Sequence, residues 1–139
     1  MNYIFEHQME VRDYECDLQG IVNNSVYQNY LEHARHKFLH AINLDFAQLH
    51  NDGLDAVVTR VEIDYKYSLR PRDLFGVRIR LRKKGNVRFV FEQQIVRLAD
   101  EKLIVKAEVT GVLTKNGRPI APTIFDEALK AAGHEIMTD

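Results

Sequence analysis

Residues 25–42, SVYQNYLEHARHKFLHAI, carry the clearest structural signal in the sequence. Apolar side chains recur there at spacings of three and four residues, namely at Tyr27, Tyr30, Leu31, Ala34, Phe38, Ala41 and Ile42. Such spacing aligns one apolar stripe along a helix. Asn23, Asn24 and Ser25 favour a helix start, and Ser25 with Gln28 has the spacing of a capping box. The sequence therefore predicts one long helix over residues 25–42.

Strand patterns surround this helix. Apolar and polar residues alternate in the segments that follow it, which is typical of strands with one buried and one solvated face. The predicted strands are residues 5–14 before the helix and 54–67, 75–83, 88–98 and 102–114 after it. Short connections predict that the last four form an antiparallel meander. A second, short helix is expected over residues 123–132.

A helix with one apolar stripe and a sheet with one apolar face can bury each other. We therefore predict an α+β two-layer domain that spans residues 1–139. A chain of 139 residues with 45% hydrophobic and 28% charged residues has the length and composition of one folded domain.

The charge balance and the terminus exclude several classes of protein. Nineteen basic and twenty acidic residues give a net charge of -1, so no global basic field is available for nucleic acid. The single cysteine, Cys16, excludes an internal disulfide. No stretch approaches the ~18 apolar residues of a membrane span, and residues 1–7 lack the pattern of a signal peptide. We expect no membrane partner and a reducing, cytoplasmic location.

A longer motif surrounds the start of the predicted helix. Residues 11–35 read VRDYECDLQGIVNNSVYQNYLEHAR, and they contain in order Asp17, Gly20, Ser25, Tyr27, Tyr30, Glu32 and Ala34-Arg35. This order resembles the signature of hotdog-fold acyl-CoA thioesterases of the 4-hydroxybenzoyl-CoA thioesterase type. Residues 63–65 and 69–73 (IDY and LRPRD) are similar to a second stretch of that family.

The resemblance implies a hotdog fold, in which an antiparallel sheet wraps around one long central helix. It also implies a homodimer whose sheets join edge to edge, often paired again as a homotetramer. A single sheet around one helix leaves little interior for a long ligand, so we expect the substrate pocket between subunits. No cofactor is expected, because coenzyme A is part of the substrate.

Two residues carry the expected chemistry. The resemblance implies that Asp17 acts as general base or nucleophile, and that the backbone amide of Asn24 polarises the thioester carbonyl. A helix N-terminus suits the second role, because its unpaired N–H groups and partial positive charge stabilise an oxyanion. Without the resemblance, the favoured interpretation is structural: Asp17 shapes a turn or complements the helix dipole, because Asp is common ahead of glycine in loops. The resemblance reverses that preference.

Five further residues are candidates for substrate binding: Gly20, Ile21, Val22, Tyr27 and Glu32. Gly20 lets the backbone approach a ligand closely. Tyr27 belongs to the apolar stripe, so it is expected in the core or in the pocket wall rather than in catalysis. Glu32 is either a structural partner of an arginine or a second catalytic candidate.

Arginines are the candidates for the phosphates of coenzyme A, because the guanidinium fork is bidentate and always charged. The candidates are Arg60, Arg70, Arg72, Arg88 and Arg97. The competing explanation is a solvated strand face, as expected for Arg78, Arg80 and Arg82. Histidines 33, 36 and 40 share a helical face, but no acidic or cysteine partner completes a metal site, so no metal is expected. Cys16 is expected to be a half-buried, structural thiol.

The predicted function is an acyl-CoA thioesterase that converts a thioester and water to a free acid and coenzyme A. Two alternatives stay open: a thioesterase that acts on acyl carrier protein, and a non-catalytic protein that binds acyl-CoA. A hotdog dehydratase is disfavoured, because its histidine–acid pair is not evident in the helix.

Overall fold

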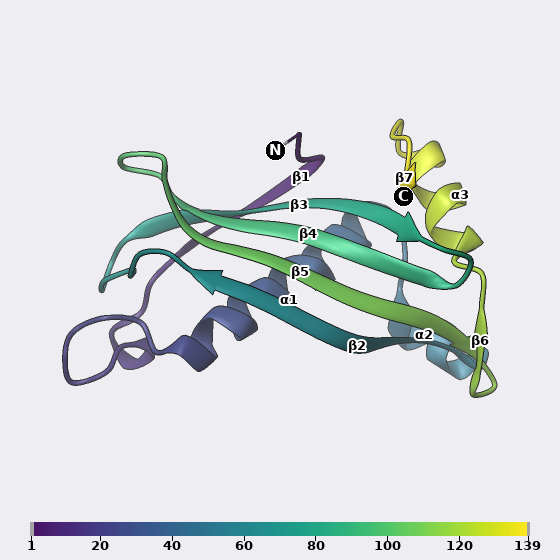
Figure 1. Cartoon of the computed structure of the whole chain (residues 1–139), viewed down its shortest axis with the longest axis horizontal. Coiled ribbons are helices and arrows are strands. Elements are labelled where there is room, and N and C mark those ends of the chain that lie inside the picture. Colours follow the sequence, from purple (N-terminus) through teal and green to yellow (C-terminus); the bar gives the residue numbers. More distant parts are fainter. Residues whose placement is uncertain (1, 139) are drawn as a thin grey trace. The chain divides into compact units, whose positions relative to one another are not determined.

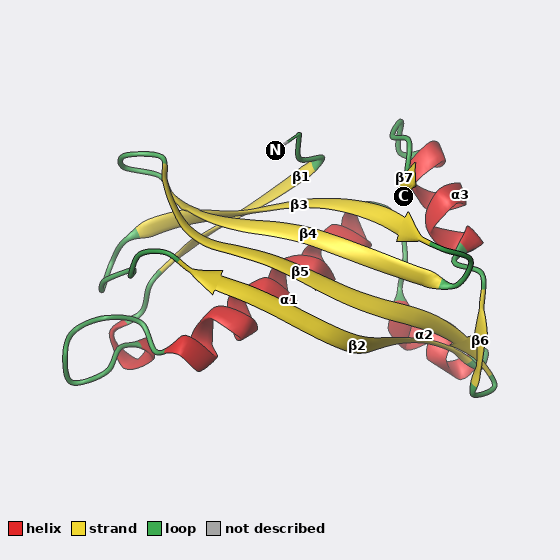
Figure 2. Cartoon of the chain, viewed as in Figure 1, coloured by secondary structure: helices red, strands yellow, loops and turns green. Residues whose placement is uncertain are grey.

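The computed structural model describes residues 2–138, and in them seven strands form one sheet that is accompanied by three α-helices. The elements in chain order are β1 (Phe5–Glu10), a 3₁₀ helix (Asp13–Glu15), α1 (Asn24–Ala41), α2 (Phe46–Asn51), β2 (Leu54–Tyr65), β3 (Leu74–Lys84), β4 (Arg88–Arg97), β5 (Lys102–Lys115), β6 (Arg118–Ile120), α3 (Thr123–Ala131) and β7 (Met137–Thr138) (Figures 1 and 2). None of the helices in this range is long and apolar enough to cross a membrane.

The predicted long helix is confirmed as α1, with each end within one residue of the prediction. Its apolar stripe is buried, including Tyr30, Leu31, Ala34 and Phe38, each at most 2% exposed. Ala41 departs from the stripe, because it is exposed at the last residue of the helix.

The predicted meander is correct for three strands and wrong for the fourth. The sheet has the order β1-β3-β4-β5-β2, so β3, β4 and β5 are neighbours in sequence and in space, as predicted. β2 lies beyond β5 instead of beside β3. The backbone N–H groups of Lys66 and Tyr67, just after β2, donate to the carbonyl of Ile104 on β5 at 2.9 and 3.2 Å. The connection between β2 and β3 therefore crosses the end of the sheet.

The exposure of β2 contradicts a second prediction. Its alternating pattern predicts one buried face, but most of the strand is exposed on both faces. Val57 and Val58, which point to opposite faces, are 45% and 47% exposed. The alternation thus indicates a strand with one face suited to burial, but the single chain does not cover that face.

Two element boundaries differ from the prediction for local reasons. The first strand ends at Glu10 instead of residue 14, because the chain turns into the 3₁₀ helix Asp13–Glu15. The sequence reading did not predict α2, which begins after Asp45. That carboxylate accepts hydrogen bonds from the N–H groups of Ala47 and Gln48 at 3.0 and 3.3 Å, as an N-cap does.

The described chain groups into two compact units, and the first holds the start of α1. This unit comprises Met1–Phe38, Ile63–Arg80 and Gln93–Ala107. Its core joins α1 to the sheet, since the ring of Tyr30 lies 4.6 Å from that of Phe75 on β3.

A buried amide strengthens this contact between α1 and the sheet. Gln93 on β4 is 1% exposed, and its Nε2 donates to the carbonyl oxygen of Leu31 at 3.0 Å. Its Oε1 accepts from Nη1 of Arg35 at 3.0 Å. Because a buried polar group without partners is costly, these bonds fix α1 against β4.

The second unit comprises Leu39–Glu62, Leu81–Glu92 and Glu108–Asp139. Phe125 of α3 is completely buried in its core, and its ring lies 4.9 Å from that of Phe89 on β4 and 6.2 Å from that of Phe46 on α2. These aromatic contacts join the short helices to the strands of this unit.

The arginines of β3 are paired, which corrects the expectation of a simple solvated face. Nε of Arg78 lies 2.9 Å from Glu6, and its Nη2 lies 2.9 Å from Glu101. Nε of Arg82 lies 2.6 Å from Glu92. The side chains of Arg78 and Arg82 are only 19% and 11% exposed, so β3 carries half-buried ion pairs on this face.

A histidine pair in the first unit predicts a dependence of stability on pH. The rings of His7 on β1 and His33 on α1 lie 5.2 Å apart. Burial, His33 and Lys37 lower the pKa of His7 below its ordinary value. Below the ordinary histidine pKa of about 6.5 the unfolded chain therefore binds more protons than the folded chain, and stability falls as the pH falls.

We expect the melting temperature to drop between pH 7.5 and pH 5.5, and to drop less in His7→Gln. Thermal unfolding followed by circular dichroism at the two pH values measures both proteins. Equal drops in the wild type and the variant would show that His7 does not carry this dependence.

Candidate active site

The segment before α1 closes on itself as a compact loop (Figure 1). Cys16 and Val22 form an isolated antiparallel bridge, and the N–H of Asp17 donates to the carbonyl of Ile21 at 2.9 Å. The N–H of Gly20 donates to the carbonyl of Asp17 at 3.0 Å, and Gly20 has a φ of 75°, which favours glycine. The chain therefore returns to its starting point immediately before the helix begins.

The carboxylate of Asp17 is exposed and is held by one of its oxygens. Oδ1 accepts from the N–H of Gln19 at 2.8 Å and, more weakly, from the N–H of Ile21 at 3.4 Å. Oδ2 has no hydrogen-bond partner among residues 2–138. Asp17 thus shapes the turn, as one of the two interpretations of the sequence expects. The same arrangement leaves the second oxygen without a partner in the described chain.

Among residues 2–138, no side-chain oxygen accepts from the first N–H groups of α1. The capping box predicted for Ser25 and Gln28 does not form, because the helix already begins at Asn24 and Ser25 lies inside its first turn. The N–H of Val26 donates to the carbonyl of Asn23 at 3.0 Å. Within the described chain, the N–H groups of Asn24 and Ser25 have no acceptor. The helix therefore presents two unpaired donors at its positive end, at the exposed residues Asn24 and Ser25.

Tyr27 lies in the core, 2% exposed, in agreement with its place in the apolar stripe. Its hydroxyl oxygen accepts from the backbone N–H of Leu69 at 2.9 Å, and burial raises its pKa. The carbonyl of Leu69 in turn accepts from the N–H of Val22 at 3.0 Å. Tyr27 therefore fixes the β2–β3 connection beside the Asp17 loop, and Val22 is buried in the same contact.

The remaining loop and helix candidates differ in exposure. Gly20 and Ile21 are half-buried in the loop. The side chain of Glu32 is 58% exposed and lies 3.8 Å from that of His36, one turn further along α1. Glu32 is eight residues after Asn24, which is about 12 Å along a helix axis. The described contacts therefore do not join Glu32 to the Asp17 loop.

The candidate arginines fall into different parts of the chain. Arg70 and Arg72 belong to the unit that contains Asp17, whereas Arg60 and Arg88 belong to the second unit. Arg60 pairs with Glu62 on the same strand. The structure thus places two of these four arginines in the unit of the candidate carboxylate.

Arg97, the fifth candidate, also lies in the first unit and is held by a strong local ion pair. Its Nε and Nη2 donate to the two oxygens of Asp100 at 2.9 and 2.7 Å. This bidentate pair lowers the pKa of Asp100 to about 2. The Nε–Nη2 edge of the guanidinium is already paired with Asp100, which makes Arg97 less suited to a phosphate than an arginine without such a pair.

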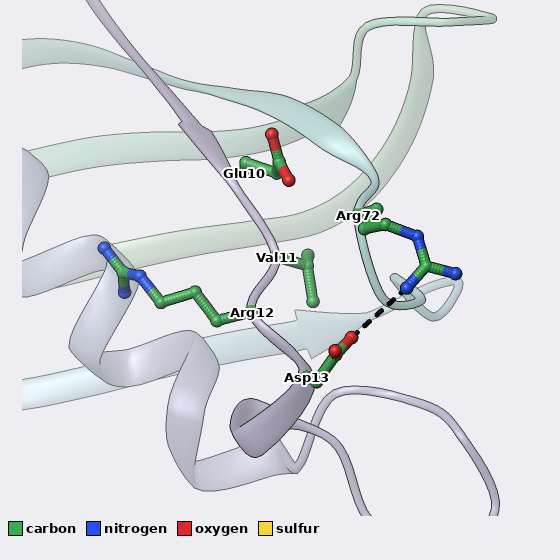
Figure 3. Close-up of a pocket in the computed structure, with 5 residues that line it drawn as sticks. All are labelled: Glu10, Val11, Arg12, Asp13 and Arg72. Atoms are coloured by element: carbon green, nitrogen blue, oxygen red, sulfur yellow. Dashed lines mark hydrogen bonds and ion pairs between the residues drawn. The ribbon is translucent and has the colours of Figure 1, made fainter.

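A surface pocket of about 360 Å³ opens beside the 3₁₀ helix, lined by Glu10, Val11, Arg12, Asp13 and Arg72. Nη1 of Arg72 lies 3.4 Å from Oδ1 of Asp13, and the guanidinium of Arg12 extends to the opposite side of the chain, toward α1 (Figure 3). The two arginines therefore do not converge on one anion here, and Asp17 is not among the lining residues.

Cys16 behaves as a structural residue. Cys16 is half-buried, and burial together with Asp13, Asp17 and other nearby carboxylates raises the pKa of its thiol, which disfavours the reactive thiolate. Over residues 2–138, no group of three or more His, Cys, Asp or Glu side chains could hold a metal ion.

A role for Glu15 was not predicted from the sequence. This carboxylate is 8% exposed, and it accepts hydrogen bonds from Arg12 and from the hydroxyl of Tyr30. Glu15 accepts from the backbone N–H of Arg12, the residue before the 3₁₀ helix, which is one half of a capping box. The spacing of three residues was visible in the sequence, but Arg12 is not one of the usual cap residues.

The architecture of a long helix packed on an antiparallel sheet agrees with comparisons to known proteins. The family model described as the Thioesterase-like superfamily matches residues 11–133, and the chain belongs to this family. The crystal structure of a hypothetical protein from Aquifex aeolicus matches with a TM-score of 0.82 and 29% identity, over 91% of this chain and 99% of that one. The predicted hotdog fold is thereby confirmed.

Two similar proteins have names that state a substrate. An acyl-acyl carrier protein thioesterase of Arabidopsis thaliana, ATL2, is 35% identical over 80% of this chain, which spans only 59% of the plant protein. The acyl-CoA thioesterase YbgC of Haemophilus influenzae is 27% identical over 95% of this chain and 96% of its own length.

Proposed function

We propose that the protein is an acyl-CoA thioesterase of the 4-hydroxybenzoyl-CoA thioesterase type, with Asp17 as its catalytic carboxylate. One observation carries the proposal. Asp17 is held through Oδ1 while Oδ2 is free, in a loop that leads directly to the unpaired N–H groups of Asn24 and Ser25. A free carboxylate oxygen and amide donors are the two groups that thioester hydrolysis requires.

In the general-base route, Oδ2 of Asp17 takes a proton from water as the water oxygen attacks the thioester carbon. The N–H of Asn24 stabilises the oxyanion that forms, and the C–S bond then breaks to release the acid and the thiolate of coenzyme A, which takes up the proton held by Asp17. In the nucleophilic route, Oδ2 attacks the carbon itself and the C–S bond breaks, which forms a mixed anhydride and releases the thiolate of coenzyme A. Water then hydrolyses the anhydride to release the acid and restore Asp17, and the proton that the water loses passes to the thiolate. Both routes need only water and the named residues, so we propose no cofactor.

The other candidates take supporting roles in this proposal. Gly20, Ile21 and Val22 form the backbone beside the thioester, and Tyr27 shapes the wall behind it because its hydroxyl already accepts from Leu69. Glu32 is exposed on α1 and stays open to a ligand.

Arg70 and Arg72 are the preferred partners for the phosphates of coenzyme A, because they share a unit with Asp17. The contact of Arg72 with Asp13 joins two side chains that are 76% and 78% exposed. An exposed ion pair of this kind is weak, so a phosphate could displace the carboxylate.

The plant relative favours a second candidate substrate, an acyl thioester of acyl carrier protein. Rates measured on the two thioesters with the same acyl chain separate the candidates. A kcat/KM higher on acyl-CoA supports the main proposal. A kcat/KM higher on the carrier-protein ester would instead favour acyl carrier protein thioesters as the substrate.

We also propose that the protein is a homodimer in which β2 meets β2 of a second copy. β2 is the last strand of the order β1-β3-β4-β5-β2, so only one of its edges is paired within the chain. Val57, Val58, Val61 and Tyr65 on this strand are 42–47% exposed. Long apolar edge strands promote pairing, and a second copy of the chain offers the same strand in a two-fold arrangement. Assembly of two such dimers into a tetramer remains compatible with this pairing.

The variant Val61→Asp is expected to convert the dimer into a monomer, because the same negative charge then enters the interface from both copies. If the pocket lies between subunits, hydrolysis falls by about tenfold or more, since the active geometry is lost. Light scattering after size exclusion gives the mass, and a thiol-release assay gives the rate. Gln48→Asp, on exposed α2, adds the same charge and should leave both unchanged. A fully active Val61→Asp monomer would contradict a shared pocket.

A further inference from the structure

Glu15 is a buried carboxylate two residues before Asp17. Its side chain is only 10% exposed, whereas that of its partner Arg12 is 53% exposed. Acidic side chains are rarely buried to this extent unless they are paired. The turn of the Asp17 loop alone therefore does not explain why Glu15 is buried.

The three oxygens of Glu15 contact Arg12, Tyr30 and Asn23. Oε1 accepts from the backbone N–H of Arg12 at 2.8 Å and from the hydroxyl of Tyr30 at 2.8 Å. Oε2 accepts from Nη1 of Arg12 at 3.1 Å. The backbone carbonyl of Glu15 accepts from the N–H of Asn23 at 3.1 Å. Glu15 therefore fixes the residue that enters the loop, the residue that precedes α1, and the interior of α1 itself.

The anchor on α1 is rigid. Tyr30 is 2% exposed, and its ring lies 4.6 Å from that of Phe75 and 6.1 Å from that of Tyr27. Burial and the hydrogen bond to Glu15 raise the pKa of Tyr30, so its hydroxyl stays protonated and remains a donor. The Tyr30 side chain, which is held by the core, thus anchors a loop whose tip is exposed.

We infer that Glu15 is a positioning residue for Asp17: its buried carboxylate holds the loop 17–21 at a fixed place relative to the first-turn amides of α1. This inference rests on the proposed function of Asp17. Loss of placement by about 1 Å can cost on the order of 100-fold in rate, even when the altered residue does not touch the substrate. Charge-assisted hydrogen bonds are the stronger ones, so the ionised carboxylate suits this role.

The test is a double-mutant cycle with Glu15→Gln and Asp17→Asn. Gln keeps the size of the side chain and one acceptor oxygen, but it loses the charge and the acceptor for Nη1 of Arg12. We expect Glu15→Gln to lower kcat by about 10- to 100-fold with KM within about twofold. In the Asp17→Asn background the same change should lower the residual rate by no more than about twofold, because a positioning residue acts only through Asp17.

Two outcomes overturn the inference. One is an equal fall in kcat in both backgrounds, which would mean that Glu15 acts independently of Asp17. The other is a folded Glu15→Gln variant with unchanged kcat. Failure of the proposed function is separate, because it appears as full activity of Asp17→Asn alone.

Two further variants keep the test decisive. Glu92→Gln removes a carboxylate whose side chain is 13% exposed and which pairs with Arg82 at 2.6 Å in the second unit. It should leave kcat within about twofold of the wild type, which separates positioning from a general loss of a buried charge. If Glu15→Gln does not fold, Tyr30→Phe removes one of the same hydrogen bonds without loss of bulk. Its kcat should also fall at unchanged KM, and an unchanged kcat overturns the inference.

Discussion

Replacement of Asp17 by Asn is expected to lower kcat for thioester hydrolysis by about 1,000-fold, within the range that general acid–base catalysis contributes. Asn is nearly isosteric with Asp, and its amide oxygen can still accept from the N–H groups of Gln19 and Ile21. The turn should therefore persist while the basic and nucleophilic oxygen is lost. Steady-state rates on the best acyl-CoA ester measure the change, and unchanged circular dichroism shows that the fold is retained.

Asp13→Asn is the matched control for this variant. Asp13 lies in the adjoining 3₁₀ helix, and its exposed carboxylate pairs only weakly with Arg72 at 3.4 Å. Its replacement removes the same charge four residues away and should change kcat by no more than about twofold. Equal losses in the two variants would indicate a general electrostatic effect and would remove the special role of Asp17.

The largest expected effect on stability comes from Phe125→Ala. Phe125 is completely buried between α2, α3 and β4, and truncation of such a side chain leaves a cavity among aromatic rings. We expect the free energy of unfolding to fall by about 3–5 kcal/mol. Urea unfolding at a fixed protein concentration measures it, since oligomerisation also contributes to apparent stability.

Lys130→Ala provides the comparison on the same helix. Lys130 is exposed near the end of α3, and Ala retains helix propensity, so the change should stay within about 0.5 kcal/mol. A loss for Phe125→Ala as small as that of Lys130→Ala would show that the aromatic cluster does not hold the second unit together.

The sequence predicted the central elements because their side-chain periods are strong. The stripe from Tyr27 to Ile42 fixed α1 within one residue at each end, and the alternation in β3 identified its buried residues correctly. The position of β2 was not predictable in the same way. Alternation states that a strand can be buried on one face, but it does not state which neighbour it pairs with or whether the chain itself covers it.

The candidate site also combines residues that the sequence points to with a residue that it does not. The resemblance to the thioesterases makes Asp17 and Asn24 candidates, and turn chemistry explains why Asp17 accepts from Gln19. Glu15 was not predicted, because its role depends on Tyr30, fifteen residues away, and on burial that arises only when the loop folds onto α1. The amides of Asn24 and Ser25 are unpaired because the predicted cap does not form, and this too was not predicted.

Hydrolysis in water enriched with oxygen-18 tests the central claim most directly. The wild-type protein is incubated with an acyl-CoA ester, and the acid product is analysed by mass spectrometry while free coenzyme A is measured with a thiol reagent. We expect equal amounts of free coenzyme A and of acid that carries oxygen-18. Saturable binding of acyl-CoA, with neither labelled acid nor free thiol above the level without protein across a panel of esters, would contradict it.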